Sequence, residues 1–193
     1  MSVTLALLFL FWVLARPWVG LLLGITTDAL VGGAALLQWL SDSNAFALHA
    51  DWLNIPTYML CGVLLFLCSV YVTCESRLLY LFCPIVFFPR RQGWGFVRVV
   101  ALAPIHEELL WRVAAQSLLN PILGTFPSVI LVAFNFTWWH RSRTGANWRL
   151  QAEFLVFALI LGASFALSGD PLLVISLHAV RNFFIFTKLI AIS

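Results

Sequence analysis

Charged side chains are the scarcest feature of this sequence. Only 10% of the 193 residues are Asp, Glu, Lys or Arg, whereas 62% are hydrophobic, and the mean hydropathy is +0.98. Soluble domains typically carry about 25% charged residues and about 45–50% apolar residues. A soluble fold of this length could not bury so much apolar surface, so the composition predicts an integral membrane protein.

Cysteine is also sparse, and its spacing carries no sign of a metal or redox motif. The four cysteines, Cys61, Cys68, Cys74 and Cys83, lie in or beside apolar runs and lack CxxC spacing. We expect them to be small buried hydrophobic side chains.

The few charges are segregated by sign along the chain. Arginines cluster within residues 90–98 and again within residues 141–149, whereas Asp42, Asp51 and Asp170 occupy other connections. This is the positive-inside pattern of membrane proteins, with both basic clusters on the cytoplasmic side. Lipid is therefore an expected partner, and nucleic acid is not.

Long apolar stretches divide the chain into spans of about 20 residues each. Residues 94–190 contain four of them, with turns predicted at residues 120–121 and 168–171. Residues 1–93 are generic spans that begin with a retained span, because the first apolar run lacks a basic leader and a cleavage site. We predict an all-α, polytopic transmembrane bundle of about six to eight spans, forming a single domain over residues 1–193 around a water-accessible cavity.

Two adjacent carboxylates, Glu107 and Glu108, interrupt the stretch that begins at Trp94. A charge at mid-bilayer costs roughly 2.5–3.5 kcal/mol on insertion scales and usually faces a polar cavity. Glu108 and Arg112 are four residues apart and can pair on one helix face. Glu107 points about 100° away and needs another partner, which suits a general base. A purely structural ion pair would explain Glu108 and Arg112 but not Glu107.

Polar residues recur in two later spans. His140 ends one of them, four residues after Phe136, and His178 lies four residues before Asn182 in the last. His178 and Asn182 share a helix face and could both donate hydrogen bonds to a developing oxyanion. Taken singly, His140 would suit an interfacial residue, and His178 with Asn182 would suit helix packing.

The ordered series Glu-Glu-x-x-x-Arg, Phe-x-x-x-His and His-x-x-x-Asn resembles the CPBP family of CaaX proteases and bacteriocin-processing enzymes, also called Abi. A proline shortly before the paired glutamates is also usual in this family, and Pro104 fits. The resemblance covers the motif-bearing spans at residues 94–190. His106 departs from the usual family residue, and its role is left open.

The resemblance implies a glutamate-type intramembrane endopeptidase similar to the Ras-converting CaaX endopeptidase. Glu107 would then deprotonate a water with help from His140, while His178 and Asn182 would stabilise the oxyanion. Glu108 and Arg112 would hold the helix of Glu107, with Phe136 as a supporting motif residue. No cofactor is expected. The implied substrate is a membrane-anchored or lipid-modified tail or leader, such as a C-terminal sorting tail or a propeptide.

Three alternatives stay open. Glu107, His140 and His178 are ligand types suited to zinc, although HExxH is absent. A non-catalytic scaffold or immunity protein on the same fold is another, although every motif position is filled. A proton-coupled transporter is the third, although no inverted repeat supports it. The short chain favours a multi-pass protein of a prokaryotic inner membrane.

Overall fold

The computed structural model describes residues 11, 52–72, 93–141 and 147–192. Every regular element in these ranges is helical, which confirms the all-α class. Among the described residues, Trp148–Ser168 is long and apolar enough to cross a membrane, and Ile55–Cys68 and Pro171–Phe186 are shorter apolar helical stretches. The count of six to eight spans stays a prediction, and most of the generic spans expected within residues 1–93 fall outside the described ranges.

The chain divides into two compact units, and each is described by itself. Unit 1 comprises residues 1–49 and 108–171, and unit 2 comprises residues 50–107 and 172–193. The expectation of a single membrane domain over the whole chain stays a prediction.

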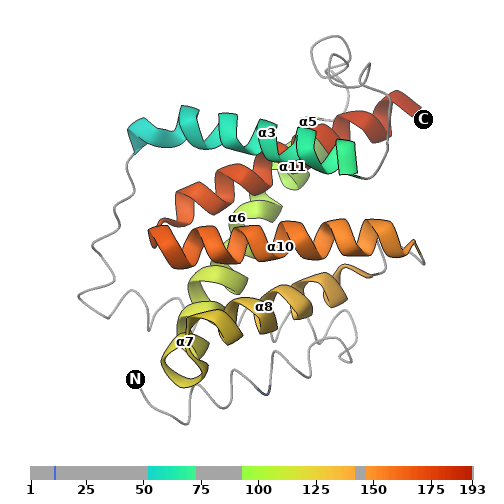
Figure 1. Cartoon of the computed structure of the whole chain (residues 1–193). Coiled ribbons are helices and arrows are strands. Elements are labelled where there is room, and N and C mark those ends of the chain that lie inside the picture. The colour runs from blue at the N-terminus through green and yellow to red at the C-terminus, as the bar shows by residue number, and fades with distance from the viewer. Residues whose placement is uncertain (1–10, 12–51, 73–92, 142–146, 193) are drawn as a thin grey trace. The chain divides into compact units, whose positions relative to one another are not determined.

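Within residues 108–171, unit 1 contains four consecutive helical segments. They are the π-helix η5 (Leu109–Gln116), α7 (Ser117–Leu123), α8 (Thr125–Trp139) and α10 (Trp148–Ser168). Helices α8 and α10 lie side by side (Figure 1). Their core is apolar and almost fully buried, with Trp111, Leu119, Val132, Phe136 and Ala158 among its members.

The turn predicted at Asn120–Pro121 is wrong. Pro121 lies inside α7, and the chain changes direction at Gly124 instead. The backbone of Gly124 has a φ of 83°, which glycine adopts without steric cost, and its N–H donates to the carbonyl of Asn120. The glycine therefore ends α7 and allows α8 to begin at Thr125.

Both ends of α10 are capped by residue types that commonly cap helices. The side-chain oxygen of Asn147 accepts hydrogen bonds from the backbone N–H groups of Arg149 and Leu150. At the other end, Gly169 has a φ of 67° and closes the last turn. This confirms the turn predicted at residues 168–171.

Unit 2 contains α3 (Ile55–Val72), preceded by the short 3₁₀ turn η2 (Trp52–Asn54), and α11 (Pro171–Ile192). Between them in sequence come α5 (Gly93–Val97), the π-helix η4 (Arg98–Leu102) and α6 (Ala103–Glu108). Helix α11 crosses α3 closely (Figure 1), because Gly62 leaves room for Val180 and the rings of Phe66 and Phe184 stack at 4.6 Å. Small residues at such crossings are typical of membrane helices.

The cysteine prediction is wrong for the two cysteines that the structure describes. Cys61 and Cys68 are exposed on α3 and are free thiols. Cys74 and Cys83 lie outside the described residues.

Gly162 sets the approach of α10 to its neighbours in unit 1. A Cβ at this position would lie 3.0 Å from Cγ1 of Val129 and 3.1 Å from Oε1 of Gln116. We expect Gly162→Ala to destabilise the protein by about 1–3 kcal/mol through overpacking. Thermal unfolding in detergent measures this.

Gly95 supplies the matched control, because an added Cβ there meets nothing within 4 Å. Gly95→Ala should leave the unfolding temperature unchanged or slightly raised, since alanine favours helix over glycine. An equal fall for both variants would contradict the close approach at Gly162.

Candidate active site

The predicted pair of Glu108 and Arg112 is present and lies in the core of unit 1. Nε of Arg112 is 3.2 Å from Oε2 of Glu108, and both side chains are fully buried. The guanidinium also donates from Nη2 to the carbonyl of Ala158 on α10 at 3.3 Å. Its carbon lies 4.5 Å from the ring centre of Phe136. The cation is thus held by a carboxylate, a carbonyl and an aromatic face at once.

Gln116 continues this arrangement and was missed by the sequence reasoning. It is buried, and its Nε2 donates to the carbonyl of Gly162 at 2.9 Å. Arg112 and Gln116 are four residues apart, and so are the carbonyls of Ala158 and Gly162 that accept from them. The signal in the sequence was the spacing of Glu108, Arg112 and Gln116 at intervals of four within an apolar stretch.

His140 follows directly on α8 and is buried among aromatic rings of unit 1. Its ring lies 4.4 Å from that of Phe136 and 4.9 Å from that of Phe154. Nδ1 is 2.8 Å from the carbonyl oxygen of Phe136. Because a carbonyl only accepts, Nδ1 must carry the proton in this contact, and the neutral ring then presents Nε2 as an acceptor. The last turn of α8 therefore fixes the tautomer of His140.

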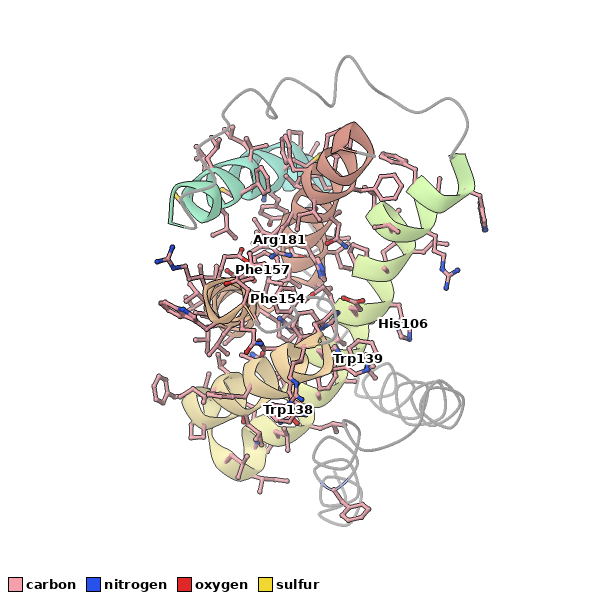
Figure 2. All side chains as sticks on the ribbon, turned by 90° about the vertical axis from the view of Figure 1, so that its right-hand side faces the viewer. His106, Trp138, Trp139, Phe154, Phe157 and Arg181 are labelled. Atoms are coloured by element: carbon pink, nitrogen blue, oxygen red, sulfur yellow. The ribbon has the colours of Figure 1, made fainter. Side chains whose placement is uncertain are left out.

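Aromatic residues of unit 1 gather around this end of α8. Figure 2 labels Trp138, Trp139, Phe154 and Phe157, which come from α8 and α10. Trp139 packs edge-on against His140 at 4.8 Å, and Phe154 stacks on Phe136 at 5.4 Å. The imidazole is thereby enclosed by apolar surface on several sides.

Glu107 meets His178 inside unit 2. Nε2 of His178 lies 3.7 Å from Oε2 of Glu107, and the two side chains are 2% and 5% exposed. Glu107 is on α6 and His178 is on α11, so the contact joins helices that are distant in sequence. The distance exceeds that of a direct hydrogen bond but is that of a charge pair when the imidazole is protonated.

Asn182 lies one turn further along α11 and is half-buried. Its Nδ2 donates to the backbone carbonyl of Val99, in the π-helix η4, at 3.0 Å. One face of α11 therefore contacts α6 through His178 and η4 through Asn182. The contact of Asn182 with η4 could not be predicted from the sequence, because every residue has a backbone carbonyl and a residue pattern does not show which one accepts.

The remaining charged groups of this region differ in exposure. His106, whose role the sequence left open, is exposed, and Figure 2 shows its ring on the outer side of α6. Arg181, on α11 beside Asn182, is buried. Within the described residues, no three His, Cys, Asp or Glu side chains form a group that could hold a metal ion.

Replacing Arg112 tests whether its contacts support the fold. Arg112→Ala should destabilise the protein by about 3–5 kcal/mol, because it leaves Glu108 as a buried charge without its cation. Arg112→Lys should still cost about 1–3 kcal/mol, because an ammonium cannot reproduce the planar guanidinium's simultaneous contacts. Thermal unfolding in detergent gives both values.

Arg149 offers a comparison in the same unit. It is exposed and lies 5.7 Å over the ring of Trp148. Arg149→Lys should leave the unfolding temperature within error of the wild type. An Arg112→Lys variant that also unfolds at the wild-type temperature would refute the importance of the guanidinium's simultaneous contacts.

Comparison with known protein families gives a match. The family model described as type II CAAX prenyl endopeptidase Rce1-like matches residues 89–184, about half of the chain. The matched range contains all three motifs and confirms the family resemblance seen in the sequence. No curated protein and no solved structure matches the chain.

Proposed function

We propose that this chain, which belongs to the Rce1-like family of type II CAAX prenyl endopeptidases through residues 89–184, is an intramembrane endopeptidase in which Glu107 activates water. The family consists of CAAX-type endopeptidases that are integral membrane proteins. The catalytic residues, the substrate and the multi-pass topology are our inference.

The observation that carries the proposal is the buried contact between Glu107 and His178. An acid and a histidine from different helices lie 3.7 Å apart in a chain of which 62% of the residues are hydrophobic. Burial of two titratable groups costs free energy, whereas burial of apolar side chains does not. The presence of these two groups therefore indicates a role in chemistry. Glu108, next in sequence, already has Arg112, which leaves Glu107 as the carboxylate for chemistry.

The reaction follows from the groups present. Glu107 removes a proton from a water molecule, and the resulting hydroxide attacks the scissile carbonyl carbon. The tetrahedral intermediate then collapses as Glu107 passes that proton to the leaving nitrogen, and the C–N bond breaks. One water is consumed, and a carboxylic acid and an amine are formed.

His140 is proposed to orient the attacking water. The carbonyl of Phe136 holds the proton on Nδ1, so Nε2 of the neutral imidazole accepts a hydrogen bond from water.

The oxyanion is proposed to be stabilised by His178 and Asn182. The two are four residues apart on α11, so both project from one face. Removal of one such donor typically lowers kcat by about 10²–10³-fold.

Purified protein in liposomes tests the proposal with two substrates. One is a prenylated peptide with a CaaX tail, and the other is an unprenylated peptide with an apolar C-terminal tail. We expect cleavage of at least one, and we expect Glu107→Ala and His140→Ala each to lower kcat by about 10²–10⁴-fold. Mass spectrometry of the products locates the cleaved bond.

His106→Ala is the matched histidine control. His106 neighbours Glu107 in sequence but is exposed, so this variant should keep the wild-type kcat. Equal turnover by wild type, Glu107→Ala and His140→Ala would rule out the mechanism. No cleavage of either tail by a folded protein would instead argue for the non-catalytic alternative.

Chelation separates the glutamate mechanism from a zinc mechanism. A catalytic zinc would need Glu107, His140 and His178 as ligands and would activate the water itself. We expect activity to survive dialysis against EDTA and 1,10-phenanthroline. Loss of activity that returns on addition of zinc would establish the zinc alternative.

A further inference from the structure

The position of Pro104 relative to η4 determines which backbone carbonyls have donors. In the π-helix η4, the N–H of Ala103 bonds to the carbonyl of Arg98, five residues earlier. The next bond in that register would run from residue 104 to the carbonyl of Val99. Pro104 has no N–H, so the backbone cannot supply this donor.

Asn182 supplies the donor that Pro104 lacks. Its Nδ2 lies 3.0 Å from the Val99 carbonyl, across a sequence separation of 83 residues. Val99 is 37% exposed. In a lipid environment no water can replace a missing donor to its carbonyl, so this contact has a reason to persist. The proline and the asparagine are thus two parts of one hydrogen-bonding arrangement.

The contact also fixes the orientation of the Asn182 amide. Because the Val99 carbonyl only accepts, the NH₂ end of the side chain must face η4. That NH₂ group carries two hydrogens, and Val99 uses one. The second hydrogen of Nδ2 therefore points in one defined direction, because the amide cannot flip and put its oxygen in that position.

We propose that Pro104 is a positioning residue that acts through the Val99 carbonyl to hold the Asn182 amide with its second N–H ready for the oxyanion. The inference rests on the proposed function for the role of that second hydrogen. Its structural part, the coupling of Pro104 to Asn182 through Val99, stands without it. Pro104 is four residues from Glu108 and three from Glu107, so the same helix presents the base and orients the donor.

Kinetics test the coupling through a double-mutant cycle. Pro104→Ala restores an N–H at residue 104, which competes for the Val99 carbonyl and releases the amide. We expect kcat to fall while KM stays within about twofold, because the oxyanion donor acts only in the transition state. Asn182→Ala should lower kcat by about 10²-fold in the wild-type background but by less than about 10-fold in the Pro104→Ala background.

Pro121 is the matched proline control, since it also lies inside a helix but in unit 1. In the Pro121→Ala background, Asn182→Ala should keep its full effect on kcat. Additive effects of Pro104→Ala and Asn182→Ala would overturn the proposal. So would a Pro104→Ala variant with unchanged kcat.

A structural readout separates this inference from the proposed function. In detergent-solubilised protein labelled with ¹⁵N-asparagine, the side-chain amide signals of Asn182 are assigned by their loss in Asn182→Ala. Pro104→Ala should shift them, and Pro121→Ala should not. If wild type cleaves no substrate but the shift occurs, the coupling holds and the proposed function fails. Unshifted signals would overturn the coupling whatever the activity.

An ester analogue covers the case in which Pro104→Ala fails to fold. Lactic acid at residue 104, introduced by nonsense suppression, lacks both the proline ring and the N–H. It should retain the wild-type Asn182 signals, because the Val99 carbonyl again has no backbone donor. Signals that move away from those of the wild type in this variant would mean that the ring, and not the missing donor, governs Asn182.

Discussion

The contact between Glu108 and Arg112 is the interaction on which the described part of unit 1 depends. A guanidinium and a carboxylate removed from water are tolerable only when each has a close partner and further polar contacts. Arg112 meets this requirement through Glu108, the Ala158 carbonyl and the Phe136 ring. These contacts join η5 to both α10 and α8. The pair therefore determines which faces of three helical segments meet.

This arrangement gives two neighbouring carboxylates different surroundings. Glu108 faces Arg112 in unit 1, while Glu107 faces His178 in unit 2. The helix α6 that ends at Glu108 lies between two π-helical stretches, η4 before it and η5 after it. Such stretches are rare and frequently occur at functional sites. At η4, Pro104 has no N–H to donate to the Val99 carbonyl, and the Asn182 side chain donates to that carbonyl.

Much of this could be predicted from residue spacing. The Glu108–Arg112 pair follows from an interval of four residues, and the C-terminal end of α10 follows from the turn predicted at residues 168–171. Residue spacing does not predict where a helix ends when the end depends on backbone geometry. Asn120–Pro121 resembles a turn, yet α7 continues through Pro121 to Leu123, and the chain turns at Gly124, which has a φ of 83°.

The candidate site could be predicted only in part from the sequence. The motifs pointed to Glu107, His178 and Asn182 as candidates, but helix boundaries drawn from hydropathy could not set the relative depths of these residues. The structure shows that Glu107 contacts His178 and that Asn182 donates a hydrogen bond to the Val99 carbonyl. Neither π-helix could be predicted, since the residue pattern of an apolar stretch with one proline is compatible with both α-helical and π-helical hydrogen bonding. The tautomer of His140 likewise depends on a backbone carbonyl that no pattern records.

We propose that Glu107 performs chemistry while Glu108 supports the fold. The most direct test is to measure both kcat and the unfolding temperature for Glu107→Gln and Glu108→Gln in one detergent. We expect Glu107→Gln to unfold at or near the wild-type temperature but to have lost turnover. Glu108→Gln unfolds well below the wild type yet keeps measurable turnover at temperatures where it is folded. The reverse pattern, or equal loss of both properties in both variants, would contradict it.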